Sequence, residues 1–189
     1  MIAGLGIVIT VLLRVGRSIA WVLIGLMVVV ILVQVFFRYV LNNALPWPDE
    51  AARFLMLWMT GLMAPSAYRW GGFVAIDMFK ELLGRRAGLV LNLLLLVIAL
   101  AVLMVALQLG IRHIKSGWLF NSGSLKVPLD LVGGEPVRMK LAWMYMSIYV
   151  GFILMTLVNI EMILKHLHML WDSSVDYGPV PDQIVMSAE

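Results

Sequence analysis

Three long stretches of this chain contain no charged residue, and they constrain its fold more than any other feature. They are Ile19–Phe37, Ala87–Ile111 and Leu141–Ile160. A helix that crosses the hydrocarbon core of a bilayer needs about 20 apolar residues, because each residue adds about 1.5 Å. Each stretch reaches or closely approaches that length. The three stretches therefore predict three membrane-spanning helices.

A fourth span is shorter and carries charges at one end. The uncharged run Phe54–Tyr68 is too short on its own, so it reaches bilayer length only if its helix begins near Trp47. Asp49, Glu50 and Arg53 then fall in the first turns of that helix. We predict an all-α integral membrane protein with interfacial amphipathic helices and four transmembrane helices, at about residues 19–38, 47–68, 87–111 and 141–163.

The composition excludes several classes of protein. Of 189 residues, 62% are hydrophobic and 13% are charged, whereas a soluble domain is about half apolar and a quarter charged. A water-soluble globular enzyme is therefore excluded. The net charge of +3 is small and its basic residues are scattered, which argues against nucleic-acid binding. The chain has no cysteine, so disulfides and thiolate metal sites are impossible, and we expect no metal and no cofactor.

The segments around the spans divide the chain further. Residues 1–17 are expected to form a helix in the membrane interface or an N-terminal extension of the first span. Residues 18–165 form the four-span membrane domain, and residues 166–189 a flexible cytoplasmic tail. Between the second and third spans, Arg69-Trp70-Gly71-Gly72 predicts a sharp stop, followed by a short amphipathic helix at Val74–Leu83 that includes Asp77. The segment Arg112–Lys140 is expected to be a loop, and it is long enough to have a role or to pack on a partner.

The orientation rests on the first pair of spans. With the N-terminus inside, each side of the membrane carries seven of the 14 basic residues, so the whole chain does not discriminate. Four basic residues lie in the connection between the second and third spans, whereas only Arg38 and the helical Arg53 lie near the connection between the first and second spans. Because basic residues favour cytoplasmic loops, we place both termini of this multi-pass protein in the cytoplasm.

Polar side chains within the spans offer little catalytic chemistry. Gln34, Asn92, Gln108 and Asn159 are neutral and are expected to hydrogen-bond to neighbouring helices. Ala106-x3-Gly110 and Ser147-x3-Gly151 are small-residue pairs that favour close helix contacts. The three histidines, His113, His166 and His168, fall at opposite ends of their spans, which argues against a shared haem. A membrane-embedded enzyme would need catalytic groups at one depth, and only Asp49 and Glu50 come close.

One charged cluster lies at the first hairpin. Arg38, Asp49, Glu50 and Arg53 lie close together in the sequence, around a Pro-Trp-Pro turn that includes Trp47. One interpretation is an ion-pair cluster that fixes the first two spans, in which Arg38 pairs with Glu50 or Asp49. The other is a docking or gating surface toward another protein. The sequence leaves both open.

The same region resembles a known family. Phe36-Phe37-Arg38-Tyr39 ends the first span, Trp47-Pro48-Asp49-Glu50-Ala51-Ala52-Arg53 opens the second, and Gly61, Arg69-Trp70-Gly71-Gly72 and Ile76-Asp77 follow. With the four-span layout and Lys126-Val127-Pro128, this series resembles the small membrane subunit of tripartite ATP-independent periplasmic (TRAP) transporters, over roughly Ala20 to Lys165. One departure is Phe73, where such subunits often have a histidine.

The resemblance implies a role and partners. A periplasmic substrate-binding protein would deliver an organic acid to a membrane complex driven by an ion gradient, with sodium as the expected ion. The large permease subunit would hold the substrate and sodium sites, and this chain would pair with it as a static scaffold among the lipids of the bacterial inner membrane. No catalytic, substrate-binding or metal-binding residue is expected here. The alternative is a membrane anchor subunit of a redox complex, with haem or quinone.

Overall fold

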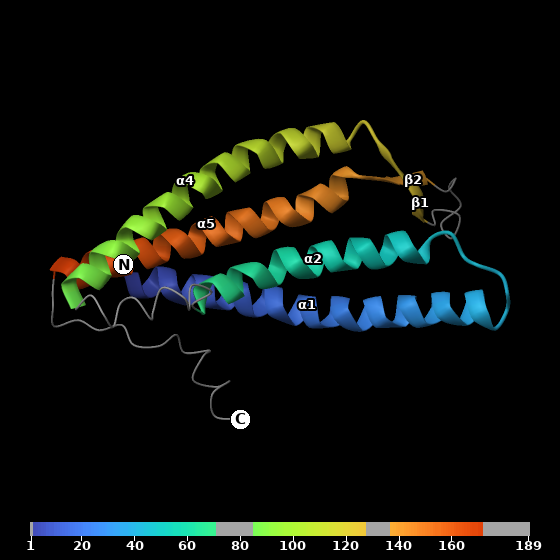
Figure 1. Ribbon diagram of the computed structural model, residues 1–189, viewed down its shortest axis with the longest axis horizontal. Helices are drawn as coiled ribbons and strands as arrows, with labels where there is room; N and C mark the ends of the chain where they lie inside the picture. Colours follow the sequence, from blue (N-terminus) through green and yellow to red (C-terminus); the bar gives the residue numbers. More distant parts are fainter. Residues whose placement is uncertain (1, 71–84, 128–136, 172–189) are drawn as a thin grey trace, which may run out of the picture.

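The computed structural model describes residues 2–70, 85–127 and 137–171 of the chain. Its helices are α1 (Ile2–Tyr39), α2 (Pro48–Arg69), α4 (Arg85–Gly117) and α5 (Ala142–Trp171), and its strands are β1 (Asn121–Val127) and β2 (Val137–Lys140) (Figure 1). The helices run alternately up and down and are therefore antiparallel to their chain neighbours. Within the described residues the fold is helical apart from one small β-hairpin.

The helices form a row in the order α1, α2, α5, α4 (Figure 1). α5 packs along both α4 and α2, and α2 packs along α1, whereas α1 and α5 touch only slightly. α2 and α5 are thus the inner helices and α1 and α4 the outer ones. The β-hairpin lies at one end of the row, here called the hairpin end, together with the loop between α1 and α2. The start of α1 and the end of α5 lie at the other, here called the N-terminal end.

The start of the chain continues the first span. α1 is one helix of 38 residues, about 57 Å long at about 1.5 Å per residue. Of the two forms expected for residues 1–17, the described residues adopt the extension of the first span. Ile9 and Leu13 are 3% and 1% exposed and form a core cluster with Val158 of α5. This packing holds the extension against the row.

The inner helices approach each other closely at small residues. A Cβ added at Gly61 of α2 would clash with the carbonyl oxygen of Ser147 in α5, and one added at Gly151 would lie 2.8 Å from the Gly61 carbonyl oxygen. Gly110 of α4 similarly faces the ring of Tyr149 in α5, at 2.7 Å from such a Cβ. Both small-residue pairs expected from the sequence therefore lie at helix contacts. At Ser147 and Gly151 the small or missing side chains let the backbones of α2 and α5 come near, whereas Gly110 makes room for a side chain of α5.

Two segments differ from the sequence expectations. The region expected as a loop begins with the last turns of α4, which ends at Gly117, and then contains β1 and β2. The strands pair antiparallel, with Val127 opposite Val137 and Asn121 opposite Lys140 and an irregularity between them. The expected flexible tail begins with helix, because α5 continues to Trp171. Gly71, Gly72, the amphipathic helix with Asp77, Phe73, and the tail beyond Trp171 lie outside the described residues.

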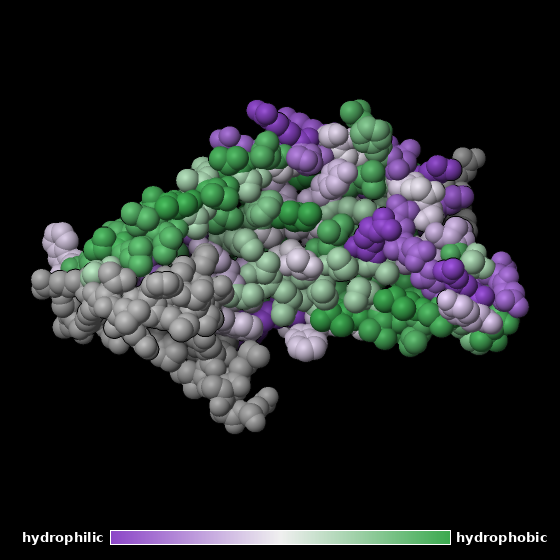
Figure 2. All heavy atoms as spheres, viewed as in Figure 1, coloured by the Kyte–Doolittle hydropathy of each residue, from purple (hydrophilic) through white to green (hydrophobic). Residues whose placement is uncertain are grey.

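Much of the outer surface is apolar. Three helices of the described residues are long and apolar enough to cross a membrane, namely Gly4–Tyr39, Ala87–Gly117 and Ala142–Trp171. In the most apolar stretch of each helix, only 6% of the residues are buried in α1 and 11% in α4, against 33% in α5. Figure 2 shows hydrophobic residues over α1 and α4 and hydrophilic ones gathered at the hairpin end. A chain with such outer helices belongs in a bilayer.

Candidate functional sites at the two ends of the helix row

At the hairpin end, Glu50 in the first turn of α2 binds the irregular middle of strand β1. Its Oε2 accepts hydrogen bonds from Ser124 N at 2.7 Å, Ser124 Oγ at 2.5 Å and Leu125 N at 3.3 Å, and its Oε1 accepts one from Gly123 N at 3.2 Å. The buried Ser122 hydroxyl accepts a further bond from Leu125 N at 2.8 Å. These bonds satisfy backbone donors at the irregularity of β1, so Glu50 fastens the hairpin to α2.

The neighbouring carboxylate, Asp49, joins α2 to α1. It accepts a hydrogen bond from Gln34 Nε2 at 2.6 Å, which confirms that Gln34 bonds to a neighbouring helix. Both acidic residues also suit the first turn of α2, because a helix N-terminus stabilises negative charge.

Among the residues that the structure describes, Arg38 does not form the expected ion pair with Glu50 or Asp49. The Arg38 guanidinium instead lies 5.8 Å from the ring centroid of its neighbour Tyr39. The physical reason is that β1 supplies backbone N–H donors to Glu50 and α1 supplies an amide to Asp49, so neither carboxylate needs a cation. Trp47 and Arg53 are exposed at the same end.

At the N-terminal end, an ion pair is buried between α2 and α5. Arg69 Nη2 lies 2.7 Å from Glu161 Oε1, and these side chains are 5% and 1% exposed. Lys165, one turn further along α5, also places its Nζ 2.7 Å from Glu161 Oε1. We refer to Arg69, Glu161 and Lys165 as the charge cluster. Two cations beside a buried carboxylate offset the cost of burying its charge, which would be high for an unpaired carboxylate at this depth.

The charge cluster also reaches α1. Arg69 Nη1 donates to Thr10 Oγ1 at 2.7 Å and Arg69 Nη2 to the Gly6 carbonyl oxygen at 3.3 Å. Thr10 Oγ1 itself donates to the Gly6 carbonyl oxygen at 2.7 Å. A single guanidinium therefore links α1, α2 and α5. In the sequence Arg69 stands out only as part of a turn, and no spacing pairs it with Glu161, although an acid directly after an uncharged span was the available signal.

Two more polar pairs connect helices near the N-terminal end. Asn159 Nδ2 donates to the Tyr68 hydroxyl, linking α5 to α2. The Nε2 of His166 lies 3.0 Å from Asn92 Nδ2, and its Nδ1 lies 2.8 Å from the Met162 carbonyl oxygen. Because a carbonyl oxygen only accepts, Nδ1 is the donor in the bond to Met162. The predicted bonding of Asn92 and Asn159 to neighbouring helices is confirmed.

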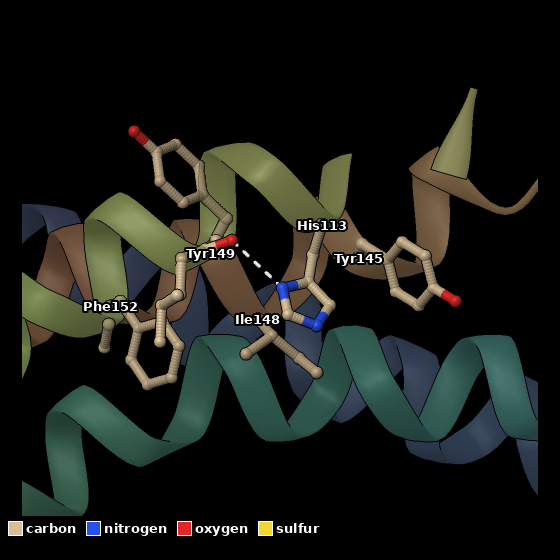
Figure 3. A pocket seen from close by; sticks show the side chains of 8 residues that line it. His113, Tyr145, Ile148, Tyr149 and Phe152 are labelled. Atoms are coloured by element: carbon tan, nitrogen blue, oxygen red, sulfur yellow. Dashed lines mark hydrogen bonds between the residues drawn. The ribbon is translucent and has the colours of Figure 1, made fainter. Parts of the chain in front are cut away.

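A pocket of about 310 Å³ lies between α4 and α5 toward the hairpin end. Its lining residues are Ala106, Leu109, Gly110, His113, Tyr145, Ile148, Tyr149 and Phe152. Figure 3 shows the His113 ring bonded through Nδ1 to the Leu109 carbonyl oxygen, at 3.0 Å, while the tyrosine hydroxyls point away from it. Such an apolar lining offers an organic anion almost nothing to bind.

The site chemistry gives no support to a redox anchor. His113 lies toward the hairpin end and His166 toward the N-terminal end, so they cannot flank one haem. Among the described residues, no group of three or more His, Cys, Asp and Glu side chains could hold a metal ion.

Long apolar helices joined by buried polar side chains define a helical membrane protein. Residues 27–169 match the family described as tripartite ATP-independent periplasmic transporters, DctQ component, so the chain belongs to this family, the small subunits of TRAP transporters. This confirms the resemblance noted in the sequence. The family is a transporter component, not an enzyme, and works with a large DctM permease and a substrate-binding protein. A comparison with curated proteins found no match.

Proposed function

We propose that this subunit is the static scaffold of a TRAP transporter that imports an organic acid, driven by a sodium gradient. It would form a heterodimer with the large permease, which carries the substrate and ion sites, and a periplasmic protein would deliver the substrate. The family match supports membership of a TRAP transporter. The organic acid, the sodium gradient and the pairing with the permease go beyond that match.

The observation that carries the scaffold role is the row itself. Its outer helices bury only 6% and 11% of their most apolar windows, so each leaves a long apolar face uncovered. Soluble monomers rarely expose such faces, and in a membrane they meet lipid or another helix. We propose that the large permease covers one outer face and that lipids cover the other.

The same row supports four membrane crossings. α2 has 22 residues, about 33 Å at about 1.5 Å per residue, and packs against both α1 and α5. Its charged residues are confined to its ends, where Asp49, Glu50 and Arg53 occupy the first turns and Arg69 the last. We propose that α2 crosses the inner membrane with the other three helices, that the hairpin end is periplasmic and that both termini are cytoplasmic.

The hairpin end is the part of this subunit that we propose to contact the periplasmic binding protein. Trp47, Arg53 and Arg38 are exposed there, and Glu50 holds the hairpin in a fixed position beside them.

Co-purification with the large permease tests this proposal. An affinity tag on this subunit should recover both proteins at one to one, and expression without the permease should lower its yield or its melting temperature, because an apolar face loses its partner. A monodisperse, heat-stable subunit that does not co-purify with the co-expressed permease would contradict the scaffold role.

A further inference from the structure

The first turns of α1 lie before the region that matches the family, which begins at residue 27. The sequence alone predicts for this segment a helix in the membrane interface or an extension of the first span. Yet Ile9 and Leu13 are 3% and 1% exposed, and they pack on Val158 with Leu5, Tyr68 and Met162 around them. The segment is therefore a built part of the bundle and belongs to its core.

The segment also completes the surroundings of the charge cluster. The Arg69 guanidinium donates hydrogen bonds to Thr10, Gly6 and Glu161. Two of these three acceptors belong to α1. Glu161 is only 1% exposed at its side chain, which requires a cover on the side away from α5. Without the first turns of α1, Arg69 would lose two acceptors and the ion pair would lose part of its cover.

Gly6 sets how closely this cover can approach. A Cβ at position 6 would lie 3.2 Å from Glu161 Oε1, the oxygen that binds both Arg69 and Lys165. The neighbour must give way by a few tenths of an ångström, and a branched side chain would require more. Gly4, one half-turn away on the same helix, has nothing within 4 Å of its added Cβ.

We propose that residues 4–13 act as a latch, which closes over the Arg69–Glu161 pair and fastens the N-terminal ends of α1, α2 and α5 into one body. The latch is closed when Thr10 and the Gly6 carbonyl oxygen accept from Arg69, and it opens when these bonds break and the Ile9 side of the helix leaves Val158. The contacts that form the latch all lie within this chain.

Cysteine labelling of the full-length chain tests the latch, because the chain has no cysteine of its own. Ile9→Cys replaces a buried residue, and Ile7→Cys replaces one that is 65% exposed and serves as the accessible reference. With N-ethylmaleimide on the detergent-solubilised protein, Ile7→Cys should react readily and Ile9→Cys should be protected. The urea-unfolded sample gives the rate of complete exposure.

The decisive comparison adds Gly6→Val or, as its matched control, Gly4→Val, which makes the same change of helix propensity. Gly6→Val should raise the labelling rate of Ile9→Cys at least about tenfold, because labelling follows the population of the open state. Gly4→Val should leave that rate unchanged. Thr10→Val, which keeps the shape and removes one Arg69 acceptor, should give a smaller rise in a protein that still folds.

Two results would overturn the latch. One is rapid labelling of Ile9→Cys in the parent chain, which would mean that the segment is open already. The other is equal protection of Ile9→Cys in the parent, Gly6→Val and Thr10→Val chains, which would mean that these contacts hold nothing. Neither result would affect the family role or the pairing test, since this assay measures only one chain.

Discussion

The two ends of the helix row hold their glutamates in opposite ways. Glu50, at the hairpin end, is partly exposed and accepts four hydrogen bonds from uncharged backbone and hydroxyl donors. Glu161, at the N-terminal end, is fully buried and shares one oxygen between two cations. The first carboxylate shapes an irregular segment that water can reach. The second is a buried charge that depends on the buried Arg69 beside it, and it should therefore be far less tolerant of change.

The largest effect is expected from neutralising the buried glutamate. Glu161→Gln keeps the size of the side chain but leaves Arg69 without its buried counter-ion, which typically costs about 3–5 kcal/mol when one partner of such a pair is removed. The melting temperature of the purified subunit, measured in detergent, should fall steeply. Lys165→Met is the control, because Lys165 is 25% exposed and Arg69 still neutralises Glu161, so its effect should be much smaller. Equal melting of Glu161→Gln and the parent would refute the charge cluster.

A moderate and local effect is expected at the other glutamate. Glu50→Gln retains one acceptor oxygen and loses the charge, and hydrogen bonds to charged groups contribute about 1.5–3 kcal/mol. Amide hydrogen exchange at Gly123, Ser124 and Leu125 should accelerate while the core of α5 stays protected. Asp49→Asn is the matched control, because Asp49 bonds to α1 and not to the hairpin. Unchanged amide exchange in Glu50→Gln would show that the charge of Glu50 does not stabilise the hairpin.

Transport gives the same comparison a functional readout. If the hairpin end contacts the binding protein, Glu50→Gln should reduce uptake while the affinity of the soluble protein for its substrate stays the same. The double reversal of Arg38→Glu with Glu50→Arg should restore nothing, since these two side chains are not paired. Recovery of uptake in the double variant would instead show a direct ion pair.

The smallest effect is expected from the exposed arginine. Arg38 lies over the ring of Tyr39, and an exposed cation–π contact contributes about 0.5–1 kcal/mol. Arg38→Gln should therefore change the melting temperature by no more than Tyr39→Leu does, and the two changes together should cost little more than one. A loss as large as that of Glu161→Gln would mean that Arg38 has an essential partner.

The sequence predicts the helices better than the contacts between their ends. The uncharged runs are sufficient to predict α1, α4 and α5, and the small-residue pairs predict the close contacts of α5 with its neighbours, because both signals are local. The bond from Arg69 to Glu161 joins residues 92 positions apart, and that from Glu50 to Ser124 joins residues 74 apart. No periodicity or spacing encodes such pairs.

The hairpin and the N-terminal extension were harder to predict for a related reason. The strands of the hairpin lie in a segment rich in Gly, Ser and Pro, and their position depends on a carboxylate from α2. Arg14 and Arg17 interrupt the apolar pattern of α1, but arginine is a good helix former, so the helix continues through them. In both places tertiary contacts decide what the local pattern leaves open.

The central claim is that all four helices cross the membrane, which places the two glutamates on opposite sides. Asn43 in the α1–α2 loop and Asn121 at the start of β1 are exposed at the same end of the row, and Trp171 is 94% exposed at the other. Single cysteines at these positions, labelled in intact cells with an impermeant maleimide, test the claim directly. Four crossings predict that Asn43→Cys and Asn121→Cys both react from the periplasm and that Trp171→Cys reacts only after permeabilisation. If Asn43→Cys and Asn121→Cys react from opposite sides, α2 does not cross and the account is wrong.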